Sequence, residues 1–320
     1  MGLEMMSWWQ PIPQATIYSV LSPLSVGVVN WLKARLQGRR GPDPLQPYRD
    51  LRKLLRIRPT VPDSASGIFL FAPPAVFTCF LLLGLALPTI YVPPGPGMDL
   101  LLVVGLLGLA KFVTTLAAFD AGSPFGPMSS GRQWFIHVLA EPTLLVAIYV
   151  FAMSRATTNL PLFATAAPDT NRLLDSPTIP LAIGALCFVL LAESGRLPFD
   201  NPATHLELTM IEDGTKLEYS GRLLALMKWA DAMKLTFALS LVAFLAFPPG
   251  GLDGHTPLTL LIAFAVYLAK IGALLVVLAW WETSRGKIRI RAIVTPLILA
   301  TGVLLFTIVI LVVGYIQPGS

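Results

Sequence analysis

Ionisable side chains inside long apolar runs are the first candidates for chemistry in this 320-residue chain. A charged group at bilayer depth costs about 2.5–3.5 kcal/mol to insert, so it must face protein or water, where it can carry or steer an ion. Lys228, Asp231 and Lys234 are spaced three residues apart. Because side chains at this spacing are neighbours on a helix, we expect a carboxylate flanked by two ammonium groups. The other members of the set are Lys111, Glu141 and Lys270.

Two interpretations of these charges stay open. In one, Glu141, Asp231 and the lysines form a hydrated polar path that relays protons or sets the local potential. An ammonium group lowers the proton affinity of a neighbouring carboxylate, whereas burial raises it, so a balanced site changes protonation when a nearby charge changes. In the other, the triplet is a satisfied salt bridge that only holds helices together.

Residues 193–221 are the most polar segment of the chain and begin where an apolar run ends. Acidic side chains alternate there with Leu, Met and Ile, which is unusual for a solvated linker. We interpret the segment as a folded cap over a polar cavity, with a plain solvated loop as the alternative. Its charged and titratable side chains are Glu193, Arg196, Asp200, His205, Glu207, Glu212, Asp213, Lys216 and Glu218.

The elements that position these side chains are membrane-spanning helices. The chain is 55% hydrophobic and 13% charged, and a soluble domain of this composition would expose large apolar patches. A helix crosses the bilayer with about 20 apolar residues. We therefore predict an all-α polytopic membrane protein, one membrane domain over residues 1–320, with about eight transmembrane helices. The predicted spans are residues 16–33, 68–91, 99–120, 134–153, 178–193, 222–247, 257–282 and 291–316.

Basic residues in the loops give the predicted orientation. They fall in the loops after the first, third, fifth and seventh spans, against Arg155 and Arg172 alone in the other loops. Loops rich in Lys and Arg stay in the cytoplasm. We expect both termini on the non-cytoplasmic side of a cell inner membrane. At about 1.5 Å per helical residue, the intramembrane charges then lie in or near the cytoplasmic half.

The first cytoplasmic loop, residues 34–67, contains a predicted basic amphipathic helix. Within residues 44–58, apolar side chains recur at helical spacing and basic ones fill the other face, a pattern typical of a helix lying in the membrane interface. The apolar positions are Leu45, Tyr48, Leu51 and Leu55, and the basic ones are Arg49, Arg52, Lys53 and Arg56. Contact with anionic lipid alone and docking of a soluble partner explain this helix equally well.

The cysteines argue against a cofactor in this chain. Cys79 and Cys187 are the only two, and both lie in apolar runs without a CxxC pattern. Iron–sulfur clusters need a set of thiolate ligands. No Walker loop, dinucleotide fingerprint or catalytic triad pattern occurs either. We expect no metal, no cofactor, no catalytic residue and no nucleic-acid partner.

The cap segment resembles a known family. Its pattern is Glu193-x-x-Arg196-x-Pro198-Phe199-Asp200-x-Pro202, followed by Glu207-Leu208 and Glu218-Tyr219-Ser220-Gly221. This pattern is similar to the signature loop of subunit 1 of respiratory complex I, which carries the mouth of the quinone cavity and the first proton path. The resemblance implies that the following residues line a cavity beneath a cluster-bearing partner: Glu193, Arg196, Asp200, Glu207 and Glu218. It also implies that Glu141 is a proton-path carboxylate, and we count Glu193, at the end of the predicted span 178–193, among the ion-path candidates.

Further stretches resemble the relatives of that subunit in membrane-bound group 4 nickel–iron hydrogenases such as formate hydrogenlyase. In residues 200–210, Ala203 and His205 stand where the quinone-reducing relatives have glutamates. The other stretches are residues 37–42, 45–55, 129–133 and 139–142. Two departures stand out: Gln133 replaces the usual Glu after an extra Gly131, and Lys216 adds charge to the expected docking surface.

The resemblance implies a non-catalytic membrane anchor and ion-path subunit. It would dock soluble hydrogenase-like large and small subunits through a loop that includes His205, Glu212 and Asp213. It would couple their electron transfer to movement of protons or another ion, together with antiporter-like membrane subunits in the lipid bilayer. The iron–sulfur clusters and the nickel–iron centre are expected in the partners.

Three alternatives stay open at this point. In the first alternative, the chain is the quinone-site subunit of a proton-pumping NADH dehydrogenase, although Ala203 and His205 disfavour a bound quinone. In the second, it is a free-standing ion transporter; this alternative predicts paired repeats in two halves, and the sequence has none. In the third, it is a structural anchor in a complex that no longer pumps.

Overall fold

The computed structural model describes residues 11–90, 92, 98–165, 178–200, 209–247 and 257–316, and these residues contain helices but no strand. The elements are α1 (Pro11–Leu36), α2 (Gln46–Arg56), α3 (Gly67–Ala86), α4 (Leu100–Asp120), α5 (Phe125–Arg155), α6 (Leu160–Thr165), α8 (Thr178–Glu193), η1 (Asp213–Lys216), α9 (Gly221–Ala246), α10 (Pro257–Ser284), η2 (Ile290–Ile293) and α11 (Val294–Ile316). The predicted all-α fold class is confirmed.

The helices that can cross a membrane agree with the predicted spans. Among the described residues, 7 helices are long and apolar enough to cross, and they are α1, α3, α4, α5, α9, α10 and α11. The remaining predicted span, residues 178–193, is the apolar helix α8, which has only 16 residues. Helix α5 begins at Phe125 rather than at residue 134, so it extends further towards its N-terminus than the hydropathy indicated. The chain is a multi-pass membrane protein.

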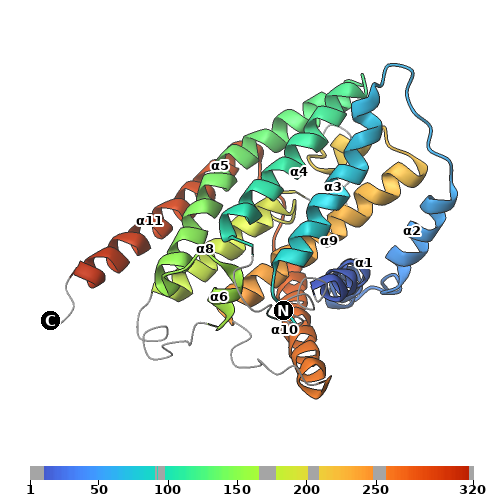
Figure 1. Cartoon of the computed structure of the whole chain (residues 1–320). Coiled ribbons are helices and arrows are strands. Elements are labelled where there is room, and N and C mark those ends of the chain that lie inside the picture. Colours follow the sequence, from blue (N-terminus) through green and yellow to red (C-terminus); the bar gives the residue numbers. More distant parts are fainter. Residues whose placement is uncertain are drawn as a thin grey trace, which may run out of the picture.

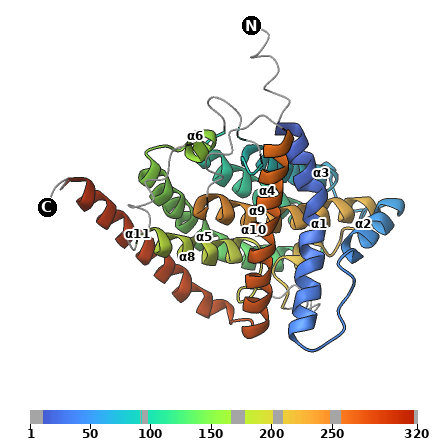
Figure 2. The same cartoon turned by 90° about the horizontal axis from the view of Figure 1, so that it is seen from below.

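The long helices form a tilted bundle that two other helices cross. Figure 1 shows α3, α4, α5, α8 and α9 running side by side, and α3 packs on α4 and α9 while α5 packs on α4 and α8. Helices α1 and α10 pack on one another and cross α9 at a steep angle (Figure 2). Helix α11 packs on α5 and α8. In the apolar windows of α10 and α11 only 22% of residues are buried inside the chain, so both helices leave most of their surface to lipid or other subunits.

The predicted amphipathic helix is confirmed as α2, which packs on α1 and α9. Leu51 is buried, and the Tyr48 hydroxyl donates a hydrogen bond to the carbonyl oxygen of Val20 in α1. The loop before α2 packs so closely on α1 that position 27 must be a glycine, because a Cβ on Gly27 would overlap the Pro44 carbonyl oxygen. The basic side chains of α2 are exposed; they are Arg49, Arg52, Lys53 and Arg56.

One end of the bundle gathers the charged loops, and we call it the charged end. There the hydroxyls of Thr60 and Ser220 lie 2.6 Å apart. The Asp120 carboxylate, at the end of α4, accepts a hydrogen bond from the backbone N–H of Ser66 (2.8 Å), just before α3. At the opposite end, the Asp99 carboxylate, just before α4, accepts a hydrogen bond from the hydroxyl of Thr158, just after α5 (3.1 Å). The charged end therefore holds the last turns of α4 and the first turns of α3 and α9.

Candidate functional site

Four polar side chains from three helices meet in the bundle and are called the histidine cluster: Lys111 of α4, His137 and Glu141 of α5, and Glu193 of α8. His137 Nδ1 lies 3.1 Å from Glu193 Oε1 and 3.1 Å from Lys111 Nζ, and His137 Nε2 lies 3.3 Å from Glu141 Oε2. Lys111 also donates directly to Glu193. The imidazole therefore bridges two carboxylates through its two nitrogens.

The local sequence explains how the histidine cluster assembles. His137 and Glu141 are four residues apart, so they project from one face of α5. Gly108 of α4 makes room for this face, because a Cβ there would lie 3.1 Å from Glu141 Oε1. The indole of Trp134 packs edge-on against the His137 ring with centroids 5.5 Å apart, and its Nε1–H donates to Thr115 (2.8 Å). These contacts fix the orientation of the imidazole.

Burial changes along the histidine cluster. The side chains of His137 and Glu193 are 3% and 4% exposed, whereas that of Glu141 is 37% exposed. A carboxylate on the flank of a membrane helix is expensive to leave against lipid. Glu141 therefore marks the place where the cluster opens towards the outside of the bundle.

A second group of charges joins the cap segment to α9, and we call it the cap cluster: Glu212, Lys216, Asp231 and Lys234. Lys216 Nζ lies 2.5 Å from Asp231 Oδ2 and 3.7 Å from Glu212 Oε1. Lys234 forms an ion pair with Glu212. The side chains of Lys216 and Lys234 are buried, whereas that of Asp231 is 32% exposed.

This arrangement corrects the predicted triplet of Lys228, Asp231 and Lys234. Asp231 pairs with Lys216 and Lys234 pairs with Glu212, both across from the cap, and Lys228 is exposed. Helical spacing identifies neighbours on one helix, but the cap segment brings closer partners from outside that helix. The interpretation of the segment as a folded cap agrees with these inward-facing charges.

The cap is held on the bundle by further contacts. Tyr219 stacks on Phe69 of α3 with ring centroids 4.1 Å apart, and its hydroxyl donates to the Phe69 carbonyl oxygen (2.9 Å). Burial raises the pKa of the Tyr219 hydroxyl above its ordinary value. Gly214 of η1 sits directly against α5, because a Cβ there would overlap Ser129 Oγ. The described part of the cap, residues 193–200 and 209–221, is therefore packed against the bundle rather than a solvated loop.

A small cavity lies between the two clusters. Its volume is about 20 Å³, and its polar lining comes from Lys111, Gln133, Glu193, Asp200 and Glu212. A buried water needs roughly 10–15 Å³ of such space and two or more polar partners, so this cavity has room for one. Gln133 Oε1 is buried and accepts no hydrogen bond from another described residue. The cavity can therefore link the histidine cluster to the cap cluster through water.

Glu282 and Asp200 connect the cap to the crossing helices. Glu282 of α10 has a fully buried side chain and lies 2.6 Å from Lys33 Nζ of α1 and 3.5 Å from Arg196 Nη1. Asp200 pairs with Lys287 (2.7 Å) and accepts from the backbone N–H of Glu212 (3.0 Å). Arg196 and Asp200, which the resemblance placed at a cavity, therefore lie in ion pairs that order the cap.

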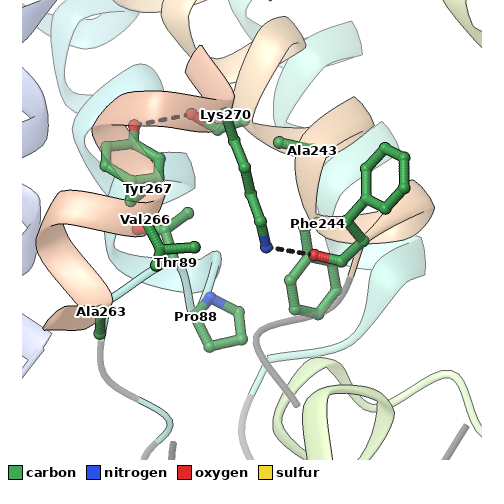
Figure 3. A pocket seen from close by; sticks show the side chains of 10 residues that line it. Pro88, Thr89, Ala243, Phe244, Ala263, Val266, Tyr267 and Lys270 are labelled. Carbon is green, nitrogen blue, oxygen red and sulfur yellow. Dashed lines mark hydrogen bonds between the residues drawn. The ribbon is translucent and has the colours of Figure 1, made fainter. Parts of the chain in front are cut away.

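Lys270 does not join either cluster. Its Nζ donates to the Phe247 carbonyl oxygen (2.6 Å) at the C-terminal end of α9, opposite the charged end (Figure 3). A pocket of about 20 Å³ adjoins it, where the hydroxyls of Tyr267 and Ser240 lie 2.8 Å apart. The predicted depth of Lys270, in the cytoplasmic half, assumes parallel helices, but α10 crosses α9 (Figure 2).

The other predicted site residues are only partly placed. Asp213 and Glu218 are partly exposed and form no ion pair with another described residue. His205 and Glu207 lie in residues 201–208, outside the described residues. In the described ranges no group of three or more His, Cys, Asp or Glu side chains is arranged to hold a metal ion.

Sequence reasoning missed two members of these networks, His137 and Glu282. A search for charged groups in apolar runs passes over His137, which is neutral by default. Its position four residues before Glu141 is the signal that was present. Glu282 was passed over because it falls at the end of a predicted span, where charged residues are common. The two tryptophans directly before it were the available signal that this position is not a plain loop residue.

Comparisons with known proteins agree with this architecture. A family model described as NADH dehydrogenase matches residues 14–313. The chain is 32% identical to formate hydrogenlyase subunit 4 of Escherichia coli (strain K12) over 299 residues, which are 93% of this chain and 95% of that protein. It is 34% identical to hydrogenase-4 component C of the same organism over 280 residues, covering 86% and 87% of the two chains.

Solved structures share the fold, and one of them illustrates it. It is described as the membrane-bound sulfane sulfur reductase, an archaeal respiratory membrane complex, and superposes with a TM-score of 0.81. The match covers 94% of this chain and 99% of the other, at 21% sequence identity. At this identity the likeness supports the fold of the bundle, and the function has to be argued from the site.

Proposed function

Because the chain belongs to the NADH dehydrogenase family, we propose that it is the membrane anchor and ion-path subunit of a complex I-like, hydrogenase-type oxidoreductase. The resemblance predicted from the cap segment, to complex I subunit 1 and its hydrogenase relatives, is confirmed by these matches. The chain itself carries no redox step in this proposal. Iron–sulfur clusters and a nickel–iron centre belong to a soluble hydrogenase-like module that docks at the charged end.

The observation that carries the proposal is a series of mostly buried charges with a partly exposed carboxylate at each end. Asp231 is 32% exposed and Glu141 is 37% exposed, and between them lie Lys216, Glu212, Glu193, Lys111 and His137. Ion pairs that only hold helices together do not need to form a connected series from one side of the bundle to another. Carboxylates next to ammonium groups and a water-sized cavity can pass an ion stepwise while the total charge stays balanced.

The two ends of this path suggest two kinds of partner. The cap ends at the charged end, where Ser220 contacts Thr60 and Arg222 donates to the Leu55 carbonyl oxygen of α2, so a soluble module would dock there over the exposed basic residues of α2. Asp231, further along α9, pairs with Lys216 of the cap. Glu141 opens on the flank of α5, where an antiporter-like membrane subunit would cover it. The path therefore runs from the docked module into the bundle and leaves it sideways.

The proposed orientation places the charged end in the cytoplasm and both termini on the other side of the inner membrane. A cytoplasm-only reporter fused after Ser320 is expected to be inactive, and a reporter that works only outside the cytoplasm is expected to be active. The opposite pair of results would reverse the orientation.

Glu141→Gln tests the ion path directly. It removes the titratable oxygen and keeps the size of the side chain, so the complex is expected to assemble and transfer electrons while ion uptake per electron pair in vesicles falls. The matched control is Asp63→Asn, an exposed acid outside both clusters, which should leave uptake unchanged. An assembled Glu141→Gln complex with normal uptake would sink the proposal.

The quinone-site alternative has one observation in its favour. An apolar cavity of about 210 Å³ lies between α8, α9 and α10, with Ser194 and Trp281 in its lining. A ligand with a long apolar tail fits such a surface better than an ion does. If the hydrogenase-type proposal is right, quinone-site inhibitors leave turnover of the complex unchanged; potent inhibition relieved by Trp281→Ala would favour the alternative.

A free-standing transporter is the alternative from another class. It predicts that the isolated chain moves ions in vesicles without any redox partner. In our proposal the isolated chain moves none, because charge changes in the docked module drive the path.

A further inference from the structure

We propose that the ion carried by this chain is a proton and that His137 is the group that relays it between Glu141 and Glu193. The inference rests on the proposed function and adds the identity of the ion and of the residue that transfers it. Glu141 and Glu193 were identified from the sequence, but they need an intermediate between them. His137 supplies it, since each of its ring nitrogens faces one of the two carboxylates.

The contacts of the ring fit a relay. Nε2 lies 3.3 Å from Glu141 Oε2 on the more exposed side, and Nδ1 lies 3.1 Å from Glu193 Oε1 on the buried side. Imidazole can hold a proton on either nitrogen, and its ordinary pKa lies close to physiological pH. The Trp134 edge and the neighbouring helices keep the ring between its partners. The path from Glu141 into the bundle therefore passes through one ring.

The transfer is balanced in protons. Before it, Glu141 is protonated, Glu193 is a carboxylate, and the neutral ring carries its hydrogen on Nδ1. The O–H bond of Glu141 breaks as an Nε2–H bond forms, and the Nδ1–H bond breaks as an O–H bond forms on Glu193. The ring then holds its hydrogen on Nε2, and the starting tautomer returns when Nε2 gives its hydrogen to water and Nδ1 takes one up from water. The reverse sequence moves a proton the other way.

Lys111 makes the same site unsuitable for a metal cation. Its ammonium group contacts both Glu193 and His137 Nδ1, so a positive charge already occupies the place that a sodium ion would need. Hard cations prefer a shell of several oxygen ligands. Here the ring nitrogens and the ammonium group replace those oxygens. The ammonium group also balances the negative charge on Glu193 while the ring is neutral.

A structural role for His137 is the competing explanation, since a buried histidine is normally hydrogen-bonded. The two roles differ in what a substitute must do. A glutamine keeps polar atoms at the position of the ring but cannot titrate. An alanine leaves a space between Glu141 and Glu193 that free imidazole from the buffer can occupy.

The experiment uses the whole complex reconstituted in vesicles, with His137→Gln, His137→Ala and, as a control for the exchange of a histidine, His255→Gln, a position between α9 and α10 outside the described residues. We expect His137→Gln to assemble and to transfer electrons, with proton uptake per electron pair reduced at least about tenfold. We expect added imidazole to restore part of the uptake in His137→Ala, with no effect on the control or on Glu141→Gln.

Several results would overturn the inference. Normal proton uptake by His137→Gln, beside lost uptake in Glu141→Gln, would remove the relay and leave the ion path in place. Uptake that follows sodium rather than protons in the unsubstituted complex would remove the assignment of the ion. Failure of both His137 variants to assemble would give the ring a structural role instead.

Discussion

The histidine cluster and Lys270 place the same kind of charge, a lysine ammonium, in apolar helices and satisfy it in different ways. Lys111 contacts a carboxylate and an imidazole, both of which can exchange protons. Lys270 donates to one backbone carbonyl oxygen, which cannot. A cation at the C-terminal end of a helix is also favoured by the helix dipole. The cost of burying a charge therefore does not identify a functional site; the chemistry of its partner does.

The largest effect that would test this comparison is expected for Lys111→Met. It leaves Glu193, which is 4% exposed, without its ammonium partner, and breaking a buried pair costs about 3–5 kcal/mol. We expect a clear fall in the amount of assembled complex and in its thermal midpoint. Lys111→Arg keeps the positive charge, so its amount of assembled complex and its thermal midpoint should fall much less. Normal abundance of the Lys111→Met complex would show that Glu193 is neutral there.

An intermediate effect is expected for Asp231→Asn, and it tests the corrected pairing. The Lys216 ammonium then keeps only Glu212, at 3.7 Å, and a poorly satisfied buried group costs about 1–3 kcal/mol. Combining it with Lys216→Met should recover part of this loss, because the two groups interact. Lys228→Met is the control and should couple to Asp231→Asn much more weakly than Lys216→Met does, because Lys228 is exposed and forms no ion pair with Asp231. Coupling to Lys228 rather than to Lys216 would restore the triplet that the sequence predicted.

Hydropathy and helical periodicity predicted the elements well. The apolar runs gave every long helix, and the alternation of Leu and basic residues gave α2. Glu141 was identified as a path candidate because a carboxylate in an apolar run is costly wherever the helix lies, and Glu193 because it closes an apolar run and opens the polar cap segment. These inferences depend only on residues that are neighbours along the chain.

The pairing of charges could not be predicted in the same way. Asp231 meets Lys216, and Glu282 meets Lys33, only because separate segments pack together at the charged end. Counting residues along α10 also ignores its crossing angle to α9 (Figure 2), so it did not predict that Lys270 contacts the C-terminal end of α9. His137 was missed because its value depends on having two carboxylates at its two nitrogens, a fact of packing rather than of composition.

The smallest effect is expected for Lys270→Met, and it tests the other half of the comparison. The variant loses the bond from Nζ to the Phe247 carbonyl oxygen and the favourable interaction with the end of α9, about 0.3–1 kcal/mol in total. Methionine keeps the apolar stem of the side chain, so the Tyr267 side of the pocket stays filled (Figure 3). The thermal midpoint should drop slightly, while ion uptake per electron pair in vesicles should equal that of the unsubstituted complex, because no titratable partner faces Lys270 in the contacts described. Measured beside Lys111→Met, it separates a lysine that serves an ion path from one that caps a helix. A Lys270→Met complex that assembles normally but moves fewer ions would show that a second path starts at the opposite end, and the comparison would fail.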